Sequence, residues 1–110
     1  MTDLDDLTRT VRRFAAERDW ERFHSQKNLA MAVAGEAGDL VALFQWLSEP
    51  ESAAYRDPHH PQRRLVEEEI ADVLIYLVRL GDVLGIDLAK AAERKIVRNR
   101  ERFPIPGASS

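Results

Sequence analysis

The sequence contains no cysteine, which limits the chemistry open to the chain. Disulfide bonds, zinc sites built on thiolates, iron–sulfur clusters and cysteine nucleophiles are excluded, so any metal site must use Asp, Glu or His. Histidine is scarce as well, with three residues in 110. A di-iron bundle needs Glu-x-x-His on two helices, and none of His24, His59 and His60 has that spacing. A metal bound here would therefore be held by carboxylates.

The sequence also lacks an excess of positive charge and a long apolar run. Lys and Arg number 16 against 19 Asp and Glu, a net charge of −3, which argues against binding a nucleic acid backbone. The first six residues are acidic, and Asp72 and Arg79 interrupt the richest apolar run, 70–80, so no signal segment or membrane span is indicated. With 45% apolar residues the chain can bury a core. We expect one soluble, cytoplasmic domain over residues 1–103 that binds neither nucleic acid nor membrane.

Proline and glycine are few, five of each, and most of them lie where the helical pattern stops. Apolar residues spaced by three and four predict four helices, over residues 3–18, 25–47, 62–84 and 87–103. Thr2 or Asp3, Ser25 and Asp87 supply N-caps, and Gly85 suits a left-handed C-terminal position. The sequence therefore predicts an all-α fold, a four-helix bundle.

Two segments fall outside this pattern. Residues 48–61 are predicted to be a loop, because Pro and Ser are frequent there and apolar periodicity is lost. Residues 104–110 are predicted to form a flexible tail.

Two of the predicted helices carry the same pair of acidic residues three positions apart. The second helix contains Glu36 and Asp39, and the third contains Glu69 and Asp72. Residues three apart lie about 60° from one another around a helix, and both pairs border apolar stripes. If the stripes face one another, four carboxylates converge in a partly dry cleft, where their repulsion favours a cation. Oxygen ligands select a hard ion, so we expect Mg²⁺, with Mn²⁺ as an alternative.

Other acidic residues have simpler explanations. A single pair of this kind is more often a solvated surface feature, and only the repetition favours a site. Glu67 is expected to be solvated, whereas Glu68, at the edge of the stripe, is either solvated or behind the metal ligands. Asp82 is expected to be a surface acid.

The second predicted helix has almost no charged face. Its glycines, Gly35 and Gly38, each cost roughly 1 kcal/mol relative to Ala in a helix interior. They either admit another helix closely or are tolerated in a well-packed one. A helix that is small or apolar nearly all round must be covered on every side, which four helices of one chain can hardly achieve. We therefore expect a dimer or a larger homo-oligomer.

Aromatic and basic residues complete the candidate site. Trp20, Trp46 and Tyr76 are available to stack on a base, although core packing is an equal explanation for each ring. The last predicted helix carries several cationic residues, of which most solvate its outer face. Lys95 and Asn99, four apart, are the best placed to hold phosphate.

Taken together, four segments resemble the MazG-like all-α nucleoside triphosphate pyrophosphohydrolases, in particular their dCTP pyrophosphatase branch. The resemblance covers about residues 14–104 and rests on FAAERDWERFHSQKNL, GEAGDLVALFQW, EEEIADVLIYLVRL and KIVRNRERFP. It implies Mg²⁺-dependent cleavage of a nucleoside triphosphate, with dCTP favoured, to the monophosphate and pyrophosphate, as in sanitation of the nucleotide pool. It also implies a homotetramer, a dimer of dimers, with sites assembled across subunits.

The resemblance assigns roles to individual residues. Metal ligands correspond to Glu36, Asp39, Glu69 and Asp72, and aromatic residues that enclose the base correspond to Trp20, Trp46 and Tyr76. The segments that line the pocket contain His24, Lys27, Asn28, Lys95 and Asn99. The chain departs from the family pattern in two places: Asp39 replaces a glutamate, and Val11 stands where some relatives have histidine. Glu36 or Glu69 is expected to activate the attacking water.

Three other functions stay open at this point. Two are enzymatic: a housecleaning hydrolase for a broad range of triphosphates or for modified ones, and a dUTP and dUDP hydrolase. The third is a helical interaction module without activity. The presence of all four acids favours an enzyme.

Overall fold

The structure, a computed structural model, describes residues 3–107 and is all helical over that range, which confirms the predicted class. Five α-helices are present there: α1 (Leu4–Glu17), α2 (Gln26–Ala42), α3 (Glu49–Ala53), α4 (Arg63–Leu84) and α5 (Leu88–Arg102). Two short 3₁₀ helices, η1 (Glu21–Phe23) and η2 (Ala54–Arg56), lie in the connections. Thr2 and residues 108–110 of the predicted tail lie outside the described residues.

Three of the helices begin at residues that the sequence analysis named as caps. The side chain of Asp3 accepts a hydrogen bond from the Asp6 N–H at 2.8 Å. Ser25 Oγ accepts one from the Asn28 N–H at 3.1 Å, and Asp87 Oδ1 accepts one from the Lys90 N–H at 3.0 Å. Each cap satisfies a backbone donor that the first turn of a helix leaves without a partner.

The predicted loop over residues 48–61 is wrong, because this segment contains α3 and η2. Ser48 and Glu51 form a capping box: Ser48 Oγ accepts from the Glu51 N–H at 3.2 Å, and the Ser48 N–H donates to Glu51 Oε1 at 2.8 Å. Pro50 fits this first turn, since its nitrogen needs no partner there. A helix of five residues is too short to show an apolar period, so the sequence pattern missed it.

The second helix also ends earlier than predicted, at Ala42 rather than near Leu47. The chain continues through tight turns over residues 43–46. The Tyr55 hydroxyl donates to the Leu43 carbonyl at 2.7 Å and so ties η2 to the end of α2. This contact satisfies a carbonyl at the helix terminus and fixes the connection between α2 and α4.

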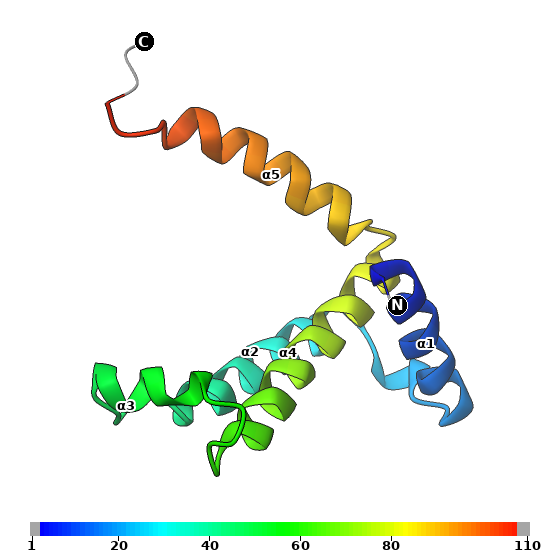
Figure 1. Ribbon diagram of the computed structural model, residues 1–110. Helices are drawn as coiled ribbons and strands as arrows, with labels where there is room; N and C mark the ends of the chain where they lie inside the picture. The colour runs from blue at the N-terminus through cyan, green and yellow to red at the C-terminus, as the bar shows by residue number, and fades with distance from the viewer. Residues whose placement is uncertain (1–2, 108–110) are drawn as a thin grey trace.

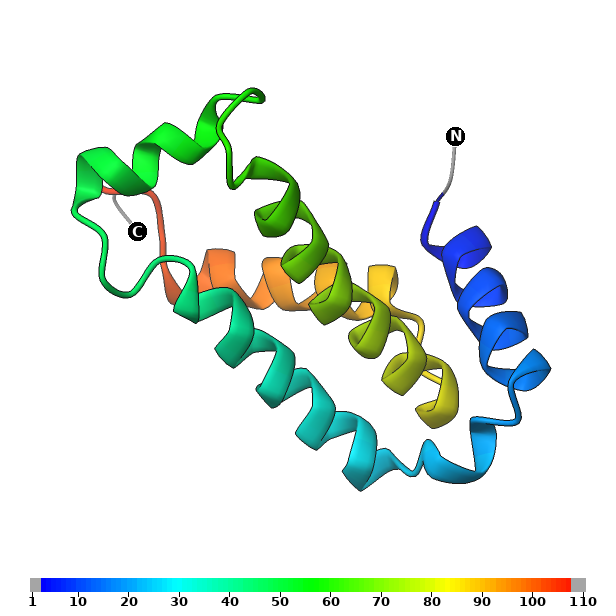
Figure 2. The same cartoon turned by 90° about the horizontal axis from the view of Figure 1, so that it is seen from below.

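An antiparallel hairpin of α2 and α4 forms the centre of the molecule (Figures 1 and 2). Leu29 of α2 and Val78 of α4 are both 1% exposed within it. α3 and η2 connect the two helices at one end, and α1 packs on the C-terminal part of α4 at the other. Ala15 of α1, also 1% exposed, is buried in that second contact. The hairpin is therefore the rigid support on which the acidic residues are placed.

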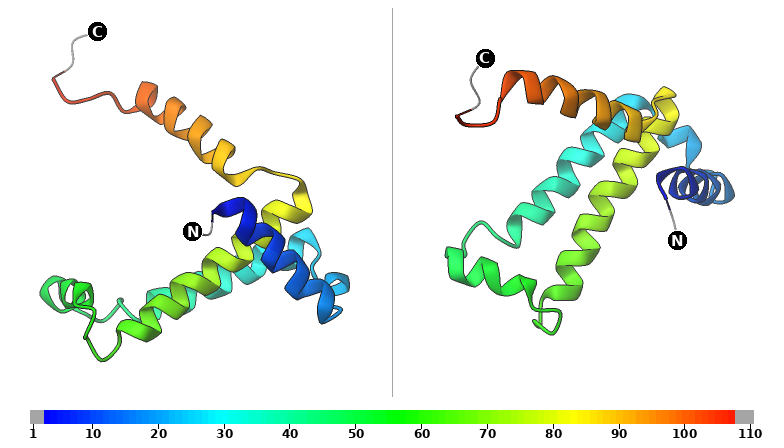
Figure 3. Two further views of the ribbon diagram at one scale, coloured as in Figure 1. Left: turned by 45° about the vertical axis from the view of Figure 1, so that its right-hand side comes forward. Right: turned by 45° about the horizontal axis from the view of Figure 1, so that its top comes forward.

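α5 leaves the hairpin instead of packing alongside it (Figures 1 and 3). Gly85 ends α4 with a φ of 70°, a left-handed conformation that favours glycine, and the Ile86 N–H donates to the Gly81 carbonyl at 2.8 Å. Leu88, the first residue of α5, packs on Gly81 so closely that an added Cβ there would lie 2.8 Å from its nearest side-chain atom. Within residues 3–107 the structure has five α-helices where four were predicted, and α5 stands apart from the hairpin, so one chain alone does not form a four-helix bundle.

The single chain leaves much apolar surface uncovered. Its accessible surface is 8789 Å², against about 6,200 Å² for a compact monomer of this mass. Its radius of gyration is 17.4 Å, against about 13 Å for a compact domain of this length. Large apolar residues that are at least two-fifths exposed include Met31, Ile70, Leu74, Ile75, Ile96 and Val97. Among residues 3–107, no helix is both long enough and apolar enough to cross a membrane.

Replacing Gly85 by alanine tests the turn between α4 and α5. We expect Gly85→Ala to lower the free energy of unfolding by roughly 1–2 kcal/mol, because a Cβ is strained at positive φ. Gly85→Asn is the matched control, since asparagine tolerates this conformation and should cost less. Urea unfolding followed by circular dichroism measures both variants, and an equal loss would exclude left-handed strain as the cause.

Candidate functional site

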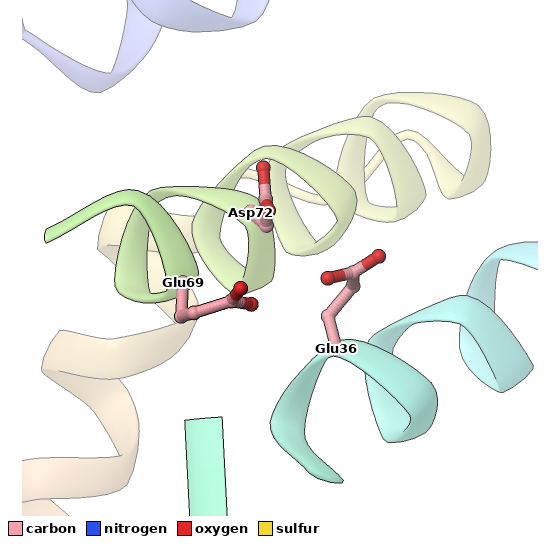
Figure 4. A group of neighbouring side chains, drawn as sticks. All are labelled: Glu36, Glu69 and Asp72. Atoms are coloured by element: carbon pink, nitrogen blue, oxygen red, sulfur yellow. The ribbon is translucent and has the colours of Figure 1, made fainter. Parts of the chain in front are cut away.

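Three of the four predicted metal ligands come together between α2 and α4 (Figure 4). Glu36 of α2 and Glu69 and Asp72 of α4 each offer one carboxylate oxygen, and these oxygens lie within 4.8 Å of one another. All three side chains are half-buried. The spacing of three residues places Glu69 and Asp72 on the face of α4 that meets α2, and Glu36 reaches toward them from the opposite helix.

Asp39, the fourth predicted ligand, is not a member of this group of three. It is exposed, about one turn beyond Glu36 on α2. Its negative charge nevertheless contributes to a raised pKa at both Glu36 and Glu69, so it lies near the cluster.

Over residues 3–107, no ion pair compensates the negative charge of this cluster. Partial burial and then the neighbouring carboxylates raise the pKa of Glu36 and of Glu69. One oxygen of Glu69, Oε2, is buried and has no hydrogen-bond partner within residues 3–107. A buried carboxylate oxygen without a partner is unfavourable, and a hard divalent cation supplies both the missing contact and the missing charge. The three carboxylates could therefore hold Mg²⁺ or Mn²⁺.

A cavity of about 260 Å³ adjoins the acidic cluster. Asp72 belongs to both, because it lines the cavity and is one of the three clustered carboxylates. The other lining residues come from α1, α4 and the segment between α1 and α2, and they include Val11, Phe14, Trp20, His24, Tyr76 and Arg79. A neighbouring hollow shares Trp20, His24 and Tyr76 and adds Asn28. An aromatic cavity therefore opens next to the acids.

The structure gathers some of the predicted substrate-binding residues and leaves others apart. Trp20, His24, Asn28 and Tyr76 line the cavity or the adjoining hollow. Trp20 is held there by Phe14, whose ring meets it edge to face with centroids 5.4 Å apart. Four of the predicted residues line neither space in the single chain: Trp46, which is 87% exposed, Lys27 on the first turn of α2, and Lys95 and Asn99 on α5.

A largely buried ion pair at the cavity, Arg79 with Asp82, was not predicted from the sequence. Arg79 is 7% exposed, and its Nε donates to His24 Nδ1 at 3.1 Å while its Nη1 donates to Asp82 Oδ2 at 2.9 Å. Arg12 of α1 donates to the same Asp82 carboxylate, which holds the pKa of Asp82 below its usual range. Asp82 is therefore an ion-pair centre rather than the predicted surface acid. A lone arginine in the apolar run of residues 70–80 was the one available indication.

Comparison with known proteins shows the family to which this helical chain belongs. Residues 32–110 match the MazG-like family, and the chain belongs to that family, which confirms the resemblance seen in its motifs. Among its relatives is dCTP pyrophosphatase 1 from Mus musculus, 45% identical over 102 residues that cover 93% of this chain and 59% of the relative. The human protein of the same name is 44% identical over 108 residues, with coverage of 97% and 62%. This chain thus spans roughly three-fifths of the length of these relatives.

A solved structure is similar over nearly its whole length. It is the crystal structure of a pyrophosphatase from Archaeoglobus fulgidus, with a TM-score of 0.85 and 36% sequence identity. The match covers 96% of this chain and 95% of that one. The open arrangement of helices seen here is therefore also found in a pyrophosphatase.

Glu69→Gln is expected to stabilise the metal-free protein at pH 7. A carboxyl group whose pKa is raised by folding destabilises the folded state wherever it is ionised. This penalty is complete above the raised pKa and disappears as the pH falls below the pKa of the unfolded chain. The advantage of glutamine should therefore shrink steadily on acidification. Urea unfolding between pH 4 and pH 7 measures it, with the exposed Glu93→Gln as control.

Adding Mg²⁺ is expected to make the wild-type protein more stable than Glu69→Gln. A ligand that binds only the folded state stabilises it, so the wild type should gain more from the metal than the variant with one carboxylate fewer. A metal-free variant that is less stable than wild type at pH 7, or an equal gain from Mg²⁺, would contradict the assignment of Glu69.

Proposed function

We propose that the chain is a metal-dependent nucleoside triphosphate pyrophosphohydrolase that cleaves dCTP to dCMP and pyrophosphate. The observation that carries this proposal is the position of Asp72, which belongs to the acidic cluster and also lines the aromatic cavity. A nucleotide with its base in the cavity has its phosphates near the carboxylates. Identity of 43–45% to proteins named dCTP pyrophosphatase 1 supports both the reaction and the substrate.

Glu36, Glu69 and Asp72 would hold the cation, with Asp39 at the edge of the site, and Mg²⁺ or Mn²⁺ suits their oxygens. When bound, the cation supplies positive charge that neutralises the triphosphate. The carboxylates of Glu36 and Glu69 are the candidate bases for the attacking water.

The reaction proposed is a single hydrolytic displacement. The oxygen of water bonds to phosphorus, the phosphoanhydride bond between the α and β phosphates breaks, and the proton of water passes to a carboxylate. No covalent intermediate with the protein is required. Trp20 and Tyr76 would stack on the base, and stacking of this kind contributes about 1–3 kcal/mol with little selectivity.

We further propose that the working form is a homotetramer, a dimer of dimers. The large exposed surface of the single chain supports this, because exposed apolar patches of such extent are typical of subunit contacts. The positions of Trp46, Lys95 and Asn99 support it as well, since these residues lie apart from the cavity of their own chain. In an assembly they would complete the site of a neighbouring subunit.

A panel of triphosphates tests the activity. With Mg²⁺ present, we expect pyrophosphate release from dCTP to exceed release from purine triphosphates. Glu36→Gln should reduce the rate by about 10²-fold or more without changing the circular dichroism spectrum, because it removes both a ligand and a candidate base. Equal rates with purines and pyrimidines would favour a broad housecleaning hydrolase, and no release from any triphosphate would favour an interaction module without activity.

Light scattering tests the assembly. At micromolar concentration we expect a mass four times that of a single chain, since one chain leaves its apolar faces uncovered.

Trp46→Ala should raise the KM for dCTP more than it lowers kcat, because the ring would contact the base rather than the reacting phosphorus. A single-chain mass would contradict the tetramer and the shared site, and wild-type kinetics for Trp46→Ala would exclude this residue from the site.

A further inference from the structure

Hydrogen bonds join four side chains in a continuous network that reaches the cavity, whose wall includes Arg79 and His24. Arg12 of α1 donates to Asp82 of α4 through Nε at 2.9 Å, and Asp82 accepts from Arg79 at 2.9 Å. Arg79 in turn donates to His24, in the turn before α2, at 3.1 Å. Arg79 and Asp82 are 8% and 12% exposed at their side chains, and His24 lines the cavity. This hydrogen-bond network therefore connects α1 and α4 to the imidazole of His24, in the turn before α2.

The direction of the last hydrogen bond fixes the protonation of that imidazole. A guanidinium group has only donors, so Arg79 Nε must donate and His24 Nδ1 must accept. A ring nitrogen that accepts carries no proton, which leaves the single proton of the neutral ring on Nε2. Burial and then the charge of Arg79 lower the pKa of His24, which agrees with a neutral ring. No group within residues 3–107 accepts a hydrogen bond from Nε2.

We propose that Arg79 is a positioning residue that holds His24 as the Nε2–H tautomer, so that the cavity presents a fixed hydrogen-bond donor to the base of a nucleotide. This inference rests on the proposed function and names the feature of the substrate that the site reads. Asp82 keeps Arg79 in place, because it accepts from Nη1, a guanidinium nitrogen that His24 does not use, and Arg12 in turn donates to Asp82.

Asn28 supplies the complementary acceptor. Its side-chain Nδ2 donates to the Phe23 carbonyl at 3.2 Å, which fixes the amide and leaves Oδ1 as the acceptor. Asn28 and His24 line the same hollow together with Trp20 and Tyr76. The two residues give this hollow one donor and one acceptor, which match a base that has an amino group next to a ring-nitrogen acceptor, as cytosine has. Uracil and thymine offer the reverse pair, a ring N–H next to a carbonyl oxygen. The site is therefore predicted to select the amino-bearing base.

Two substitutions of His24 distinguish the role of Nε2 from the role of Nδ1. The side-chain nitrogen of glutamine can occupy the place of Nε2, whereas that of asparagine can occupy only the place of Nδ1. We expect His24→Gln to keep the preference for dCTP over dUTP within about threefold. His24→Asn should raise the KM for dCTP by about tenfold, with a smaller effect on kcat and on dUTP, since one hydrogen bond to the base is lost.

Nuclear magnetic resonance of the histidine ring nitrogens tests the tautomer without any turnover. In the wild-type protein at pH 7, we expect His24 to carry its proton on Nε2 only. In Arg79→Met, which removes the donor, the two tautomers should mix, whereas the exposed Arg13→Met should leave the His24 spectrum unchanged.

Three results would overturn the proposal: a proton on Nδ1 in the wild-type protein, an unchanged tautomer in Arg79→Met, or equal loss of preference in His24→Gln and His24→Asn. If Arg79→Met does not fold, the wild-type spectrum and the pair of His24 variants still decide. Wild-type protein that hydrolyses no triphosphate would refute the proposed function, and the tautomer would remain measurable.

Discussion

Carboxylates that repel one another face each other across the α2–α4 hairpin, and the packing of these two helices holds them there. Helix contacts around fully buried residues such as Leu29 and Val78 provide the opposing free energy. The capped start of α2 and the connection through α3 set how the two helices face one another. The aromatic cavity and the exposed apolar faces are both arranged around this hairpin, which holds unfavourable charge.

A second group of charges, around Asp82, lies further along α4 and behaves in the opposite way. There the carboxylate accepts from two arginines, so its pKa is lowered and its contribution to stability is present at neutral pH and lost as the pH falls. The Glu36 and Glu69 carboxyls, with raised pKa values, are relieved by the same acidification. α4 thus contributes to one group that stabilises the fold and, together with Glu36 of α2, to another that destabilises it. Only the destabilising group offers free oxygens to a cation.

Local spacing explains what the sequence could predict and what it could not. The acids of each pair are three residues apart on one helix, so their shared face followed from helix geometry alone. Caps such as Ser25 and Asp87 were equally local. By contrast, Arg79 and His24 are 55 positions apart, and their hydrogen bond depends on how α1, α2 and α4 pack. The direction in which α5 leaves α4 depends on the turn at Gly85 and on the contact between Gly81 and Leu88. The spacing of apolar residues does not predict that direction.

The middle of α4 has a further consequence for the unfolded chain. Residues 73–78, VLIYLV, are six successive β-branched, aliphatic or aromatic residues without charge, a composition that promotes cross-β aggregation when exposed. Asp72 and Arg79 flank this segment. Asp72 belongs to the acidic cluster, and Arg79 belongs to the hydrogen-bond network around Asp82. Charges beside such a segment oppose strand stacking before the helix has formed. The two residues that belong to the site thus also place a charge at each end of this segment, in the position that gatekeeper residues occupy.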